Sequence, residues 1–497
     1  MIDPIVETYV WVGLVVFLIM VAGLGYLGSR QTKTLADFTI GGARLGPYIL
    51  GIAYAATFFS AATFVGYVGW AYAWGYSTLW VFLAIFVAST AGALTFARKA
   101  RTENIKQRSQ SLPDWLGDYY NSDFLRAGVA VILLFNLFYV AAQLTAGAYV
   151  FNLLLGWDYL TALAFITLVV VGYVVAGGTF ADVYTDAVQG VLMVLMGLIC
   201  FISGMTFLGE GGLTGLTETL RNIDPNLVAV FNPEAVHFYA LSVVIGVFII
   251  EYAFAAQPQL FNKILALKKP GDLWKMITTY FVCAFCMMLV IFVGFFAHDV
   301  GLVVDVPDHT IYYFAGTLFH PIVAALLVMV IMSAALSTTD GLIVVLATTF
   351  SNDLYRKTLV KRGIIKAVSQ QQVDRTALKI SRIATVFIGI IAGTLVINPP
   401  AFIGTLIWYG ISGVASGTLG PLIIGMFMKD KVTAKGAVIT MFLGVISYGV
   451  IFLLGFERSV MAAGAWAVCI STAFFLVYTL LFPKKADIDQ DAVAKAN

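Results

Sequence analysis

Charged residues are scarce in this chain. Asp, Glu, Lys and Arg make up 11% of its 497 residues, whereas an ordinary soluble domain is about one quarter charged. Hydrophobic residues make up 60% of the chain, and its mean hydropathy is +0.92. This composition excludes an ordinary soluble protein and indicates a polytopic membrane protein.

Cysteine is also rare. The four cysteines, Cys200, Cys283, Cys286 and Cys469, all fall in apolar segments. Cys283 and Cys286 form a CxxC pair, but no second pair or nearby histidine completes a metal site. We therefore expect the cysteines to pack in the protein interior.

Several functional motifs are absent. There is no Walker A motif, which excludes an ATP-driven pump. No nucleophile–base pair or metal set points to an intramembrane enzyme, and nothing indicates a nucleic-acid partner. Residues 1–8 lack the basic start of a signal peptide, so we expect the first apolar stretch to be a retained helix.

Long apolar segments fill most of the chain. Thirteen of them are long enough, at about 20 residues each, to cross a bilayer as a helix. The sequence therefore predicts an all-α polytopic membrane protein. The expected spans are 7–28, 47–72, 77–97, 127–155, 158–177, 184–208, 237–258, 274–297, 321–350, 378–398, 401–427, 434–455 and 460–482.

Lys and Arg are unevenly distributed among the predicted loops. If the N-terminus is outside, 27 of the 29 basic residues fall on the inner side, and only Arg221 and Arg458 fall outside. Because cytoplasmic loops retain positive charge, we expect the N-terminus outside and the C-terminus inside, in a plasma (inner) membrane. The two long inner connections, 97–124 and 354–377, are predicted to be solvated.

Two of the expected spans are interrupted by residues that disfavour a regular helix. Span 47–72 lies in a stretch, 45–75, that contains five glycines and a run of hydroxyl residues, and span 237–258 carries Glu251 at mid-membrane, followed by a Gln-Pro pair. The hydroxyl residues are Thr57, Ser60 and Thr63. Two interrupted helices five spans apart are typical of inverted-repeat transporters, whose site lies where the repeats meet.

The expected span 321–350 contains the polar stretch LSTTDG. Ala334, Ser337 and Thr338 lie on one face of this helix. A neutral cage of five oxygens would form here. Its oxygens are the Ala334 carbonyl, the two hydroxyls, and the carbonyls of Ala56 and Phe59, which an unwound second span would release. Such a cage suits a hard monovalent cation, namely sodium. In the alternative interpretation, the hydroxyls only bond back to their own helix and bend it.

Five motifs, in order, resemble those of the sodium/solute symporter family, which includes proline, pantothenate and monocarboxylate permeases. They are ADFTIGGARLGP, FSAATFVG, GGTFADVYTDAVQG, AQPQLFNKILALK and MSAALSTTDGLIVVLATTFSNDLYR. The resemblance implies thirteen spans and a five-plus-five inverted repeat of the leucine-transporter type. The parts are then an extra helix and loop at 1–45, repeats at 46–210 and 211–428, and two extra helices and a tail at 429–497.

The resemblance also implies roles for particular residues. Ala56, Phe59, Ala334, Ser337 and Thr338 match the usual sodium site of the family. Asp186 matches a carboxylate on the path by which sodium leaves, or in a second sodium site. Asp340, for which the resemblance implies no role, is a second candidate for that place. Asp182 is expected to be a helix N-terminal residue favoured by the helix dipole.

The chain departs from its apparent relatives at several positions. Phe58 stands where proline carriers have an Asp, and Thr63 where sugar carriers have a Gln. The resemblance implies no role for Glu251 or Asp340, and a carboxylate at mid-membrane is a functional candidate. Glu251 can bind a substrate amine, and Asp340 can face sodium, a second cation or a proton; each can also be a paired structural carboxylate.

The predicted function is sodium-coupled import of a monocarboxylate, a pantothenate-like compound or an amino acid by alternating access. The alternatives are a proton-coupled carrier that uses Asp340 or Glu251, and a sensor built on a symporter scaffold. The expected partners are the solute, sodium and membrane lipids, and the expected state is a monomer. The expected substrate-binding residues are Thr57, Phe58, Ser60, Ala61, Thr63, Glu251, Phe254, Gln257 and Gln259.

Overall fold

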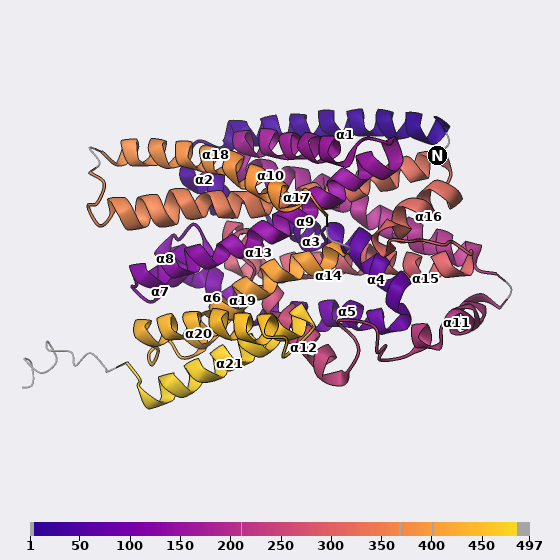
Figure 1. Ribbon diagram of the computed structural model, residues 1–497. Coiled ribbons are helices and arrows are strands. Elements are labelled where there is room, and N and C mark those ends of the chain that lie inside the picture. The colour runs from indigo at the N-terminus through magenta and orange to yellow at the C-terminus, as the bar shows by residue number, and fades with distance from the viewer. Residues whose placement is uncertain (1–3, 210, 367–368, 400–401, 485–497) are drawn as a thin grey trace, which may run out of the picture.

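The structure is a computed structural model that describes residues 4–484, apart from 210, 367–368 and 400–401. Long helices lie side by side along one direction (Figure 1), with α1 (Pro4–Gln31) along one edge and α20 (Ala434–Leu453) and α21 (Val460–Leu481) along the other. Among the described residues, strand-like pairing is limited to one bridge between Leu45 and Leu267. The predicted all-α class is confirmed.

Eleven helical segments in the described part of the chain are long and apolar enough to cross a membrane. Two shorter apolar helices, Pro47–Phe58 and Tyr159–Gly172, accompany them. One of the eleven, Ala62–Gln107, joins the end of the second expected span to the whole of the third. The number of thirteen crossings stays a prediction.

Both expected interruptions are present. Helix α3 (Pro47–Phe58) stops, and after residues 59–61 the chain continues as a short π-helix, η2 (Ala62–Gly66), and α4 (Tyr67–Trp74). At this break the Ser60 hydroxyl accepts a hydrogen bond of 3.2 Å from the Ala62 amide, which offers the backbone an alternative to the helix.

The second interruption lies in the expected span 237–258. Helix α12 (Leu241–Phe254) ends at an unwound stretch, 255–257, and α13 (Pro258–Ala266) follows. Pro258 occupies the first turn of α13, where its missing N–H costs no helical hydrogen bond. The interruption was predicted correctly, but the second half-helix reaches further along the chain than expected.

The connection expected between spans 158–177 and 184–208 is a sharp break. Element α10 (Tyr159–Phe207) consists of two helices that meet at Gly178, whose backbone is not helical (φ 55°, ψ −153°). A Cβ at Gly178 would lie 2.5 Å from a ring carbon of Phe38 in α2 (Leu35–Ile40). Only glycine accommodates both this conformation and this close packing.

The two connections predicted to be solvated are partly helical. The first is buried over 109–117, whereas 361–366 and 369–372 of the second are exposed, as predicted. Helix α6 (Thr90–Gln107) extends into the first connection, and α7 (Leu112–Tyr119) follows it with Leu112, Trp115 and Leu116 buried. The π-helix η11 (Thr349–Val360) continues α17 (Pro321–Thr348) into the second connection. The hydroxyl of Ser111 donates a hydrogen bond of 2.7 Å to Asp353, which joins the two connections.

The remaining helices complete the bundle, and α17 and α19 are buried over most of their length. The four cysteines are unpaired, and Cys200 is buried. The other helix bounds are α5 (Leu79–Ala84), α8 (Asp123–Ile132), α9 (Asn136–Tyr149), α11 (Gly212–Ile223), α14 (Leu273–Met288), α15 (Phe292–Asp299), α16 (Thr310–Leu318), α18 (Gln370–Leu395) and α19 (Ile403–Phe427).

Candidate ion- and substrate-binding site

The end of α3 meets the middle of α17 through hydroxyl and carbonyl oxygens. The Ser337 hydroxyl donates to the Ala56 carbonyl at 2.9 Å and lies 3.4 Å from the Ala334 carbonyl. The Thr338 hydroxyl donates to the Thr57 carbonyl at 3.0 Å. The structure therefore brings most of the predicted sodium cage together, with the Thr57 carbonyl as an additional oxygen beside it.

Two neighbouring residues clarify this arrangement. Phe59 is buried where α3 leaves helical geometry (φ −85°, ψ 86°). Thr339 donates to the carbonyl of Ala335 in its own helix. Thr339 thus shows the intrahelical bonding that the alternative interpretation expected of Ser337 and Thr338. Those two hydroxyls donate to α3 instead, and the contact of Ser337 with its own helix is longer, at 3.4 Å.

A buried charged cluster adjoins the cage. The Thr57 hydroxyl donates to Asp186 at 2.7 Å. The Lys263 ammonium donates to Asp182 at 2.6 Å and to Asp186 at 2.9 Å, and all three charged side chains are buried. Asp182 is therefore more than the helix N-terminal residue that was expected, because it belongs to a buried ion pair.

Sequence reasoning missed Lys263, which was counted among the basic residues of an inner loop. The structure instead places it on α13 with 2% exposure. A lysine five residues after Pro258 in the interrupted span was the available signal. An ammonium group is rarely buried so fully unless it is paired with a carboxylate.

Asp340 completes the cluster. One of its carboxylate oxygens accepts a hydrogen bond of 2.8 Å from the Gly341 amide. One carboxylate oxygen from each of Asp182, Asp186 and Asp340 lies within 4.8 Å of the others. When ionised, three carboxylates exceed the single charge of Lys263, so the cluster favours binding of a further cation.

Gln259 lies beside the charged cluster rather than in the aromatic region where a substrate is expected. A Cβ at Gly341 would contact both the Asp182 carboxylate and the Gln259 Cβ, at 3.4 and 3.6 Å. The Gln259 amide atoms are buried and have no hydrogen-bond partner among the described residues. They are available to a bound ion or to water.

The expected substrate region is an aromatic cluster. The rings of Phe58 and Phe254 have their centroids 4.4 Å apart, and Trp408 of α19 packs edge-on against Phe254 at 5.8 Å. The Tyr139 ring of α9 lies 6.4 Å from Phe254. Aromatic side chains from four elements thus pack together beside the two breaks, and side chains of this kind commonly line small-molecule sites.

Polar side chains hold the unwound stretches in place. The Ala61 amide donates to the Gln143 side chain at 3.0 Å, and the Gln257 amide group donates to the Ile411 carbonyl at 3.0 Å. Thr63 is buried on η2 and bonds through its backbone to Ser60. Gln143 was not predicted, because nothing near it in the sequence marks it as the partner of a distant break.

Glu251 is fully buried on α12. Neither of its carboxylate oxygens has a hydrogen-bond partner among the described residues. The tyrosines Tyr67, Tyr139 and Tyr280 lie within electrostatic range of it. A buried carboxylate of this kind is stable only with a proton or with a cation bound next to it.

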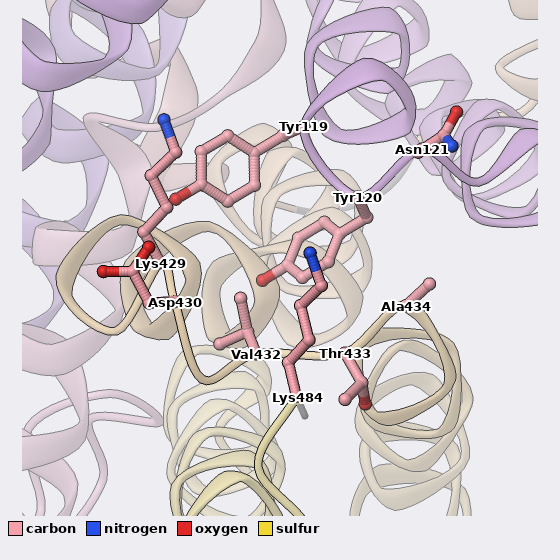
Figure 2. Close-up of a pocket in the computed structure, with 9 residues that line it drawn as sticks. All are labelled: Tyr119, Tyr120, Asn121, Lys429, Asp430, Val432, Thr433, Ala434 and Lys484. Carbon is pink, nitrogen blue, oxygen red and sulfur yellow. The ribbon is translucent and has the colours of Figure 1, made fainter. Parts of the chain in front are cut away.

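A cavity of about 590 Å³ lies away from this site, at the end of the bundle (Figure 2). None of the predicted binding residues lines it, and its Lys429 is already paired with both oxygens of Glu103 at 3.1 Å. We therefore do not assign it to transport. The cavity is lined by Tyr119, Tyr120, Asn121, Lys429, Asp430, Val432, Thr433, Ala434 and Lys484.

Comparison with known families agrees with this geometry. The family model "Sodium:solute symporter family" matches residues 38–444. The chain belongs to this family. The match confirms the resemblance of the motifs, and it makes the protein a multi-pass membrane symporter of the plasma membrane rather than an enzyme.

Curated symporters of the family resemble the chain over most of its length. It is 26% identical to the high-affinity proline transporter PutP of Bacillus subtilis (strain 168), covering 85% of this chain and 87% of the relative. It is 25% identical to the osmoregulated proline transporter OpuE of the same organism, covering 90% and 89%. It is also 25% identical to the sodium/proline symporter of Salmonella typhimurium, covering 87% and 86%.

Solved symporter structures share the fold. A Na+-coupled sialic acid symporter in a substrate-bound outward-open state matches with a TM-score of 0.77 at 18% identity, over 96% of this chain and 99% of that one. MhsT in complex with L-phenylalanine matches with a TM-score of 0.51 at 15% identity, over 87% of this chain and 98% of that one. These matches show that the chain shares the fold of these proteins.

Proposed function

We propose that this symporter uses the sodium gradient to import a small organic solute by alternating access. The observation that carries the proposal is the meeting of Ser337 and Thr338 with the carbonyls at the broken end of α3, at 2.9 and 3.0 Å. When sodium is bound, the two hydroxyls turn their lone pairs to the ion, and the Ala56 and Ala334 carbonyls, which now accept hydrogen bonds from Ser337, become ligands.

The proposed sodium ligands are the five residues that the sequence predicted. They come from the broken α3 and from α17, so a bound ion holds the two helices together. A state in which α17 moves away from α3 then binds sodium weakly, and this difference in affinity is what couples the ion to the conformational cycle. The proposed ligands are Ala56, Phe59, Ala334, Ser337 and Thr338.

Asp186 and Asp340 are proposed as the exit path for sodium or as a second sodium site. Thr57 connects the cage to Asp186, since its carbonyl accepts from Thr338 and its hydroxyl donates to Asp186 at 2.7 Å. Carboxylate and hydroxyl oxygens are suitable ligands for sodium. An ion that leaves the cage therefore finds its next ligands one residue away.

The transport scaffold is proposed to consist of two inverted repeats, 46–210 and 211–428, flanked by 1–45 and 429–497. Thirteen crossings, with the N-terminus outside and the C-terminus inside, accord with the basic residues that concentrate on one side. Each repeat begins with one of the two interrupted helices. We propose a monomer surrounded by lipid.

An amino acid is the solute class that the site favours, and L-proline is its first candidate. The relatives just named transport proline. The Glu251 carboxylate has no hydrogen-bond partner among the described residues and lies on α12, three residues before Phe254. It suits an ammonium group and disfavours a monocarboxylate or pantothenate, whose charge is negative. Glu251 is therefore proposed as the partner of the substrate amine.

The remaining predicted substrate residues have supporting roles in this proposal. Ser60, Ala61, Thr63 and Gln257 shape the unwound segments that border the aromatic cluster. Thr57 and Gln259 lie toward the ion cluster. A proton-coupled carrier is a second candidate because Glu251 lacks a protein partner and can bind a proton instead.

Uptake of radiolabelled L-proline into proteoliposomes tests the proposal. We expect accumulation with an inward sodium gradient and none when choline replaces sodium. A thermal-shift panel of amino acids, monocarboxylates, pantothenate and sugars, each with and without sodium, identifies the solute class if L-proline is not transported. Accumulation that is undiminished in choline and driven by a pH gradient would instead support proton coupling.

A further inference from the structure

Lys263 occupies a place that a cation would be expected to take. Its ammonium group lies 2.6 Å from Asp182 and 2.9 Å from Asp186, and the lysine is 2% exposed. The other carboxylate oxygen of each aspartate has no hydrogen-bond partner among the described residues. The ammonium thus contacts only one oxygen of each carboxylate, and ligand capacity for an ion remains beside it.

The cluster adjoins the proposed sodium cage through one residue. The Thr57 carbonyl accepts a hydrogen bond from the Thr338 hydroxyl, and the Thr57 hydroxyl donates one to the Asp186 carboxylate. One oxygen of Asp186 accepts both the hydrogen bond from the Thr57 hydroxyl and the hydrogen bond from the Lys263 ammonium group. A sodium ion that moves from the cage to this oxygen must therefore compete with the ammonium group.

The position of Lys263 in the fold allows it to move. It lies on α13, the short half-helix that begins directly after the unwound stretch 255–257. Its partners lie on α10, a separate long helix. A lysine ammonium is a compact charge on a flexible stem, which can leave a carboxylate without the loss of a bidentate fork.

We propose that Lys263 is a tethered cation that pairs with Asp182 and Asp186 in the sodium-free carrier and is displaced by sodium on its way from the cage. The inference rests on the proposed sodium coupling and goes beyond it, because it assigns a competitor for sodium within the protein. The empty carrier then changes conformation with a cation still paired with its buried carboxylates, which lowers the cost of their buried charge. Lys263 is a positioning residue in this role and does not touch the solute.

A sodium titration of the purified full-length chain tests the proposal without knowledge of the solute. Thermal unfolding is followed as NaCl replaces choline chloride at constant ionic strength. Removing the competitor in Lys263→Gln is expected to lower the half-saturating NaCl concentration at least tenfold. Lys263→Arg keeps a cation at the site and is expected to stay near the wild type.

Two further variants keep the test decisive. Lys275→Gln removes an exposed lysine that is paired with Asp272 at 3.0 Å on the neighbouring α14, and it is expected to change nothing. If Lys263→Gln does not fold, the double variant Lys263→Gln/Asp182→Asn removes one positive and one negative charge together. It is then compared with Asp182→Asn alone and is expected to bind sodium more tightly.

The results separate this inference from the proposed function. A wild type that responds to sodium, with a Lys263→Gln variant of equal or weaker sodium affinity, overturns the inference and leaves sodium coupling standing. A wild type that gives no response to sodium overturns both.

Discussion

The hydroxyl of Ser337 donates a hydrogen bond of 2.9 Å to the carbonyl of Ala56, which lies 281 residues earlier in the chain. The bond joins the middle of α17 to the last turn of α3, next to the break. Because α3 and α17 belong to different proposed repeats, any motion that separates the repeats here must break it. A sodium ion bound among the same oxygens would add ligand bonds across this contact.

The double variant Ser337→Ala/Thr338→Ala is expected to raise the sodium concentration needed for half-maximal uptake at least tenfold. Two of the five proposed ligands are lost, while the carbonyls remain. Uptake into proteoliposomes as a function of NaCl measures the change. Thr339→Ala is the matched control, because it removes a hydroxyl that bonds within its own helix. An equal effect of both variants would point to a general loss of helix packing.

Glu251→Gln is expected to weaken binding of L-proline, or of whichever amine-bearing solute stabilises the protein, at least tenfold. The amide keeps the size of the side chain but removes the negative charge that faces the ammonium group. A monocarboxylate, which lacks the ammonium, is expected to bind no more weakly to the variant than to the wild type. Thermal shift with each solute measures both effects. Glu218→Gln, in an exposed pair with Arg221, is the control.

Asp340→Asn separates sodium coupling from proton coupling. If Asp340 only helps sodium to leave, the variant is expected to concentrate solute more slowly but still on a sodium gradient alone. If Asp340 carries the proton, a pH gradient without sodium drives uptake by the wild type and not by the variant. Uptake under each gradient imposed separately distinguishes the two. Sodium-driven accumulation by the variant removes Asp340 as the proton group.

The breaks in the second and seventh spans could be predicted because their signals are local. Glycines and hydroxyl residues surround Ser60, and Pro258 restarts the helix after Gln257. The proposed sodium ligands Ser337 and Thr338 could be placed on one face from their spacing alone. In such cases the physical cause lies within a few residues of the feature.

Lys263 could not be predicted because its environment comes from distant parts of the chain. The side chain is buried by its contacts with Asp182 and Asp186, which lie 81 and 77 residues away. A lysine at the edge of an apolar segment ordinarily belongs to a loop, so its charge was assigned to the inner side. Gln143, which bonds to the Ala61 amide, was missed for the same reason.

A pH effect is expected at the segment that connects α15 to α16. Asp308, in the turn Pro307–His309 before α16, is 1% exposed. One carboxylate oxygen accepts a hydrogen bond of 2.8 Å from the Ile403 amide at the start of α19, and the other lies against Gly69 of α4. Burial raises the pKa of Asp308 to about 7, although the hydrogen bond from Ile403 acts in the opposite direction.

The sign of the effect follows from this raised pKa. The pKa is about 3.8 when the carboxyl is exposed in the unfolded chain, so the folded segment favours the protonated form. This contribution to stability is complete below about pH 4 and is lost as the pH rises through about 7. Burial lowers the pKa of the neighbouring His309, so that histidine is neutral near pH 7 and does not oppose the trend there.

We expect the unfolding temperature of the wild type to fall relative to Asp308→Asn between pH 5 and pH 8, because the amide cannot ionise. Faster amide hydrogen exchange in 307–318 at the higher pH, relative to the same segment in Asp308→Asn, locates the effect. A difference in unfolding temperature that stays constant over this range would show that Asp308 does not titrate there.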